Sequence, residues 1–223
     1  MNHSRRKFFR EIITGAAAAG VAGLSQELAA SAQTTLSPDA ALQQLIDGNR
    51  RFTEGGMTSF DEDLNVLKAK TVENQEPFAA VLSCADSRVP VELVFDQSIG
   101  HLFVTRVAGN IATSAMIASL EYSVAVLGTR AIMVLGHANC GAVKASIEAE
   151  AVPGQISALY PYIRPAVDQA GPDLEATIKA NAKIQAALLR QSSPVLAEHI
   201  KKSQLKIVAG YYDLASGSVA VLD

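Results

Sequence analysis

The 223-residue sequence has little of what characterises nucleic-acid-binding or membrane-spanning proteins. Its 19 basic and 22 acidic residues give a net charge of −3, and no basic patch occurs outside the first ten positions. The longest apolar run near the N-terminus, Ile12 to Leu24, has thirteen residues, whereas a membrane-crossing helix needs roughly 20. We therefore expect no nucleic-acid partner and no integral membrane domain.

The first 32 residues have the three parts of an export signal. Arg5 and Arg6 precede the short apolar run, and Ala30-Ser31-Ala32 supplies small residues suited to cleavage. The paired arginines favour the twin-arginine route. We therefore expect a signal peptide over residues 1–32, a single domain over residues 33–223, and export to a periplasm. A thylakoid lumen and the cell exterior also fit, and a basic N-terminus followed by an Ala-rich helix is the alternative.

Cysteine is scarce, since the chain contains only Cys84 and Cys140. In an exported protein two cysteines invite a disulfide. Their surroundings fit a metal better, because Cys84 is followed by Asp86 and Arg88, and Cys140 is preceded by His137. Both interpretations remain open on the cysteines alone.

The remaining residues predict one α/β domain. Without residues 1–32, the chain keeps 15 basic and 20 acidic side chains in about 190 residues, enough for one sizeable core. Short apolar runs predict strands buried on both faces at 78–83, 102–107, 131–136 and 206–212. Helical spacing is found at 40–48, 114–127, 141–150 and 174–191. This alternation predicts a mainly parallel central sheet flanked by helices, with residues 218–222 as an antiparallel edge strand.

The carboxyl ends of parallel strands lie at one edge of a sheet, where chemistry gathers. Cys84 directly follows the first predicted strand, His137 follows the third, and Cys140 begins the next helix. A Cys₂His set leaves the fourth tetrahedral position free for water, which is typical of a catalytic zinc. The amino end of the helix would also favour the thiolate of Cys140.

Asp86 and Arg88 are two residues apart, which puts both side chains on one side of an extended segment. The planar guanidinium of arginine can bind both oxygens of a carboxylate. We interpret Arg88 as holding Asp86 off the metal, so that Asp86 accepts a hydrogen bond from metal-bound water. The alternative is a surface ion pair worth about 0–1 kcal/mol.

Taken together, these residues resemble the bacterial-type β-class carbonic anhydrases, and the resemblance covers nearly all of residues 33–223. The matching motifs are Leu45-x-x-Gly48-Asn49-x-Arg51-Phe52, Ser83-Cys84-Ala85-Asp86-Ser87-Arg88-Val89, Arg106-Val107-Ala108-Gly109-Asn110, Ser119-Leu120-Glu121-Tyr122, Gly136-His137-x-x-Cys140-Gly141 and Gly210-x-Tyr212-Asp213-x-x-x-Gly217-x-Val219.

The resemblance implies the β-carbonic anhydrase fold and an activity. One zinc ion per subunit would be held by Cys84, His137 and Cys140, with Asp86 and Arg88 as the catalytic dyad. The reaction would be the reversible hydration of carbon dioxide to bicarbonate and a proton, through attack by a zinc-bound hydroxide.

The resemblance also implies a substrate pocket at a dimer interface, and hence a homodimer or a larger dimer-based oligomer. Gln75 matches a glutamine that donates a hydrogen bond to substrate, and Phe103 and Tyr122 match aromatic positions that line the pocket. Phe103 and Tyr122 could equally be ordinary core side chains.

The sequence departs from the family pattern at two points. Ala138 stands where a serine frequently follows the zinc histidine, which removes one hydrogen bond near the metal. The chain also has no tryptophan, a residue that lines a non-catalytic bicarbonate pocket in some bacterial members. With Gln75 present, its absence favours an open site with water on zinc.

Two other functions fit the same residues. Related proteins of this fold hydrolyse carbon disulfide or carbonyl sulfide, and nothing in the sequence excludes those substrates. A non-catalytic, zinc-binding periplasmic protein could keep the fold as well, but the loss of Asp86 or Arg88 that would favour it has not occurred.

Overall fold

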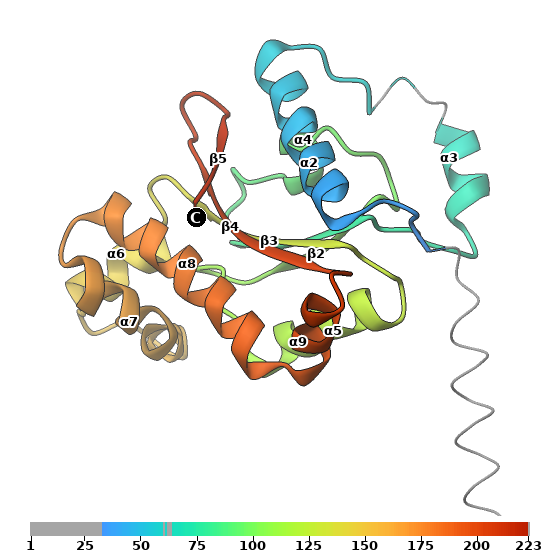
Figure 1. The fold of residues 1–223 in the computed structure, drawn as a ribbon. Coiled ribbons are helices and arrows are strands. Elements are labelled where there is room, and N and C mark those ends of the chain that lie inside the picture. The colour runs from blue at the N-terminus through green and yellow to red at the C-terminus, as the bar shows by residue number, and fades with distance from the viewer. Residues whose placement is uncertain (1–32, 60, 62–63, 223) are drawn as a thin grey trace, which may run out of the picture. The chain divides into compact units, whose positions relative to one another are not determined.

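The centre of the computed structural model is a five-stranded sheet in the order β2-β1-β3-β4-β5 (Figure 1). The strands are β1 (Ala79–Ser83), β2 (Leu102–Arg106), β3 (Ala131–His137), β4 (Lys206–Tyr212) and β5 (Val219–Val221). The first four are parallel, and β5 pairs antiparallel with β4. The predicted fold class is confirmed, including the antiparallel strand at the C-terminal edge.

The structure describes residues 33–59, 61 and 64–222. The signal peptide expected over residues 1–32 lies outside the described residues, and residues Gln33–Asp223 form one compact unit. None of the helices within the described residues has the length and hydropathy to span a membrane.

Helices pack on both faces of the sheet (Figure 1). One face contacts α2 (Pro38–Glu54), and the other contacts α5 (Ser114–Ala125), α8 (Leu174–Ser192) and α9 (Pro194–Lys201). All residues of β1 and β3 are buried, as expected for strands covered on both sides. The remaining helices are α3 (Leu64–Thr71), α4 (Val91–Val94), α6 (Gly141–Glu148), α7 (Tyr160–Ala170) and a 3₁₀ turn, η1 (Ile156–Leu159).

Helix α2 begins where the sequence predicts and ends later than expected. The Ser37 hydroxyl caps it by accepting a 3.2 Å hydrogen bond from the Ala40 amide. The helix then continues through Gly48 to Glu54. A Cβ at Gly48 would lie only 1.8 Å from the Phe95 carbonyl oxygen. This glycine is therefore required by the close packing of α2 on the segment after α4, and it does not end the helix.

The parallel register brings the ends of β1 and β3 to one edge of the sheet. Ser83, the last residue of β1, lies beside Leu135 of β3. The segment that follows β1 therefore leaves the sheet next to His137, which is the last residue of β3 rather than the first residue after it. A Cβ at Gly136 would lie 3.0 Å from Ile178, so α8 packs closely against this edge.

Candidate metal centre

Three predicted ligands form one buried cluster at this edge. The ligand atoms of Cys84, His137 and Cys140 all lie within 4.8 Å of one another, and their residues are 4%, 0% and 1% exposed. The two sulfur atoms are 4.0 Å apart, and both cysteines are free. A tetrahedral ion with metal–sulfur bonds of about 2.3 Å would hold two sulfurs about 3.8 Å apart. The spacing therefore fits a zinc ion.

His137 presents one ring nitrogen to the cluster. Its Nδ1 lies 2.9 Å from the Ala138 carbonyl oxygen, so Nδ1 carries the proton and Nε2 keeps its lone pair. Nε2 is buried and has no hydrogen-bond partner among the described residues. A buried acceptor without a partner is costly, and a metal ion at the cluster would satisfy it.

The loop between β3 and α6 brings Cys140 back toward His137. Asn139 has a φ of 55°, in the left-handed region that asparagine tolerates better than most residues. This turn places Cys140 at the N-cap of α6. The prediction that Cys140 begins a helix is confirmed, and its sulfur lies at the positive end of the helix dipole.

The sulfur atoms of the two cysteines lie within hydrogen-bonding distance of each other, at 4.0 Å. The hydrogen bond from the Cys140 thiol lowers the pKa of Cys84 to about 4, against the opposing effect of burial. The same interaction, together with burial, raises the pKa of Cys140 well above its usual range. Cys84 is thus the cysteine that ionises more easily. A bound cation would favour loss of the proton from the Cys140 thiol as well.

Asp86 and Arg88 are in direct contact beside the cluster. Arg88 donates from Nε to Oδ1 of Asp86 at 2.9 Å and from Nη2 to Oδ2 at 2.7 Å. These hydrogen bonds hold the pKa of Asp86 below its usual range. Oδ2 of Asp86 lies 3.8 Å from Nε2 of His137. An ionised carboxylate therefore lies next to the nitrogen that faces the cluster.

Arg106, at the end of β2, had no predicted role of its own, and the structure places it at the cluster. Its Nε donates to the Cys84 carbonyl oxygen at 2.9 Å, and its Nη2 donates to the Asp86 carbonyl oxygen at 2.5 Å. Its position at the carboxyl end of a predicted strand was the signal that could have found it. Arg106 fixes the backbone that carries both a predicted ligand and the predicted dyad.

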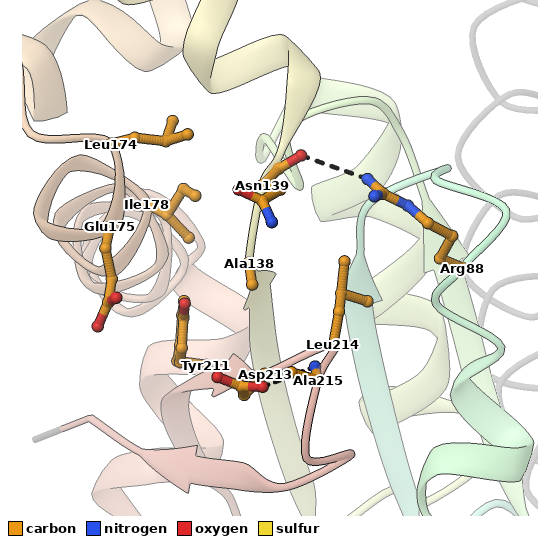
Figure 2. A pocket seen from close by; sticks show the side chains of 10 residues that line it. All are labelled: Arg88, Ala138, Asn139, Leu174, Glu175, Ile178, Tyr211, Asp213, Leu214 and Ala215. Atoms are coloured by element: carbon orange, nitrogen blue, oxygen red, sulfur yellow. Dashed lines mark hydrogen bonds between the residues drawn. The ribbon is translucent and has the colours of Figure 1, made fainter.

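A cavity of about 510 Å³ adjoins the loop between His137 and Cys140. Figure 2 shows Arg88 reaching toward Asn139, and Tyr211 across the cavity from them. Arg88 Nη2 donates to the Asn139 carbonyl oxygen at 3.3 Å. The other lining residues are Ala138, Leu174, Glu175, Ile178, Asp213, Leu214 and Ala215.

The three residues predicted to line a substrate pocket lie outside the lining of this cavity. Gln75 is exposed in the segment between α3 and β1. Phe103 on β2 and Tyr122 on α5 are neighbours, with ring centroids 6.4 Å apart, and Tyr122 is 46% exposed. None of the three is among the described residues that line the cavity.

Comparison with known proteins assigns the family. A family model described as carbonic anhydrase matches residues 79–219. The solved structure of the β-carbonic anhydrase CcaA is 28% identical, with a TM-score of 0.64, over 82% of this chain and 95% of that one. The chain belongs to the β-class carbonic anhydrase family.

Named carbonic anhydrases cover most of the chain. Carbonic anhydrase 2 of Mycobacterium tuberculosis is 33% identical over 84% of this chain and 94% of its own length. A carbonic anhydrase of Mycolicibacterium smegmatis is 35% identical over 82% of this chain and 92% of its own length. This β-class carbonic anhydrase is therefore an enzyme whose described residues include a Cys–His–Cys cluster suited to a metal ion.

Proposed function

We propose that the chain hydrates carbon dioxide reversibly to bicarbonate and a proton, with one zinc ion per subunit held by Cys84, His137 and Cys140. One observation carries the proposal. A buried Cys₂His cluster, with a free imidazole nitrogen, lies beside a carboxylate that an arginine holds with two hydrogen bonds. Three protein ligands with a neighbouring acceptor are typical of a catalytic rather than a structural zinc site.

The roles of the side chains follow from their contacts. When bound, zinc supplies a Lewis acid and lowers the pKa of a coordinated water from 15.7 to about 7. Asp86 would accept a hydrogen bond from that water and orient it toward the substrate. Arg88 donates to both oxygens of Asp86, which would keep the carboxylate from binding the zinc. Arg106 holds the backbone of Cys84 and Asp86 and thus sets the distance between ligand and acceptor.

The substrate pocket of this proposal needs a second subunit. We place Gln75, Phe103 and Tyr122 at a dimer interface, where Gln75 donates a hydrogen bond to substrate. The exposed Tyr122 and its neighbour Phe103 support an aromatic surface that association would cover. Sedimentation equilibrium of the full chain tests this assembly. A dimer or a multiple of a dimer is expected, and a monomer at micromolar concentration would contradict it.

Carbon dioxide is the expected substrate rather than carbon disulfide or carbonyl sulfide. We would assay all three on one zinc-loaded preparation of the full chain, with Cys140→Ser as the variant that loses a ligand. Carbon dioxide hydration that is lost in Cys140→Ser supports the proposal. Hydrolysis of carbon disulfide or carbonyl sulfide, without hydration of carbon dioxide, would instead identify the sulfur compounds as the substrates. A zinc-loaded chain inert toward all three would favour a non-catalytic zinc-binding protein.

We further propose that residues 1–32 direct twin-arginine export to a periplasm. The paired Arg5 and Arg6, the apolar run and the small residues at its end support this. A reporter protein fused after residue 32 should reach the periplasm, and changing both arginines to lysine should retain it in the cytoplasm. If the reporter still reaches the periplasm after both arginines are changed to lysine, the twin-arginine route is refuted.

A further inference from the structure

Two buried amide side chains lie on the inner face of α8. Asn181 and Gln185 are 0% and 1% exposed, and they are one helical turn apart. Gln185 Nε2 donates to Asn181 Oδ1 at 3.2 Å, and Gln185 Oε1 accepts from the Ala112 amide at 2.9 Å. Since Oδ1 of Asn181 accepts from Gln185, its Nδ2 faces the other way. That Nδ2 donates to the Gly109 carbonyl oxygen at 2.9 Å.

Gly109 connects this network to the metal cluster. Its amide donates to the Cys84 sulfur at 3.3 Å. Its φ is 77°, and a Cβ there would lie 2.8 Å from Cδ1 of Ile163. The backbone conformation favours glycine here, and Ile163 of α7 packs closely against it. The residue is held on one side by Asn181 and aims its N–H at Cys84 on the other.

We propose that Asn181 is a positioning residue of the metal centre, which holds Gly109 so that the Gly109 amide stays hydrogen-bonded to the Cys84 sulfur. The inference rests on the proposed metal site. An N–H donor to a ligand thiolate withdraws charge from it and fixes its direction, and such partners of the ligands control metal affinity. Gln185 completes the arrangement because it fixes which end of the Asn181 amide faces Gly109.

The effect of this network differs from that of an ordinary buried hydrogen bond. Asn49 offers a matched comparison, because its Nδ2 donates to the Val94 and Gly217 carbonyl oxygens at 3.0 and 2.9 Å. Asn49 is also buried, at 6% exposed, and neither of its carbonyl partners carries a donor to the cluster. Removing either amide should destabilise the fold. Only the removal of the Asn181 amide should change the zinc affinity and the charge-transfer band of bound cobalt.

The test uses the full chain loaded with cobalt(II) or with zinc. In Asn181→Leu, we expect the sulfur-to-cobalt charge-transfer band to shift and the zinc affinity, measured by chelator competition, to fall about 10-fold to 100-fold. In Asn49→Leu, we expect a lower melting temperature with the band and the zinc affinity unchanged. If Asn181→Leu keeps the band and affinity of the unsubstituted protein, the inference is overturned and Asn181 is structural only.

A second variant keeps the inference testable if Asn181→Leu does not fold. Gln185→Glu keeps the acceptor for the Ala112 amide but loses the donors to Asn181 and to the Tyr162 carbonyl oxygen, so the Asn181 amide can turn away from Gly109. We expect a smaller change in the same direction for both the band and the zinc affinity. An unchanged band and affinity in Gln185→Glu would count against the inference. An unsubstituted chain that binds neither metal would overturn the proposed metal site itself.

Discussion

At the scale of single residues, Asp86 could serve either as a metal ligand or as a hydrogen-bond acceptor for water in the proposed zinc site. Its Oδ2 is 3.8 Å from the His137 nitrogen that faces the cluster, so a small movement would make it a fourth ligand. Arg88 opposes that movement with three hydrogen bonds, two from its guanidinium and one from its backbone amide at 2.9 Å. In the proposed zinc site, the choice between ligand and acceptor would therefore depend on Arg88.

Removing that arginine should abolish most of the activity without removing the metal. In Arg88→Ala, we expect zinc content to stay at the unsubstituted level and kcat/KM for carbon dioxide hydration to fall about 10-fold to 100-fold, because Asp86 is free to approach the zinc. Stopped-flow hydration with metal analysis measures both. Arg164→Ala is the control, since Arg164 forms an exposed ion pair with Asp168 on α7 and its loss should leave hydration unchanged. Unsubstituted activity in zinc-loaded Arg88→Ala would refute the dyad.

At the scale of elements, Asp96 ties the segment after α2 to the end of α4. Its side chain is fully buried and accepts hydrogen bonds from Arg51 Nε at 2.5 Å and from the Thr58 and Ser59 amides at 3.0 and 2.8 Å. Burial alone would raise the pKa of Asp96, but these donors outweigh it and hold the pKa below its usual range. The charged form is thus the stable one in the folded protein.

This arrangement predicts an acid-dependent contribution to stability. Because the folded pKa lies below the unfolded value of about 3.9, the contribution is complete above about pH 4 and is lost as pH falls through the folded pKa. Asp96→Asn should therefore lower the free energy of unfolding by about 2 kcal/mol at pH 7, and by less at pH 3. Urea unfolding of both proteins in their metal-free form at both pH values measures this difference, because acid would release zinc from a Cys₂His site.

Asp47→Asn is the control for that prediction, because Asp47 forms an ion pair with the exposed Arg50 and accepts a hydrogen bond from Gln43, both on its own helix at the surface. Its free energy of unfolding should differ little from that of the unsubstituted protein at either pH. A pH-independent loss in Asp96→Asn would contradict the assigned charge state of Asp96.

The elements differ in how well the sequence predicts them. The strands are short apolar runs with turn residues around them, and β4 begins and ends at the predicted residues. Helix α7 was not predicted, because Pro161 and Pro165 lie within it and proline usually ends a helix. Pro161 is tolerated because it occupies the first turn, where the missing N–H has no intrahelical partner.

At the scale of the whole molecule, contacts set by short spacing or by parallel strand order were predictable, and contacts set by how helices pack were not. Asp86 and Arg88 are two residues apart and pair as predicted, but a turn brings them together rather than the expected extended backbone, since the Val89 amide donates to the Asp86 carbonyl oxygen at 3.1 Å. Cys84 and His137 meet because parallel strands end at one edge. The hydrogen bond of Asn181 to Gly109 spans 72 positions and depends on how α8 packs, which no local pattern encodes. The pocket residues Gln75, Phe103 and Tyr122 remain predictions, since their proposed partners belong to a second subunit.

In the proposed mechanism, hydration of carbon dioxide depends on one zinc ion at the Cys84, His137 and Cys140 cluster. A zinc titration of the metal-free full chain, followed by stopped-flow hydration of carbon dioxide, tests this dependence. We predict activity that rises linearly and stops rising at one zinc per chain, with no such rise in Cys84→Ser. Hydration by the metal-free chain, or none with one zinc bound, would contradict it.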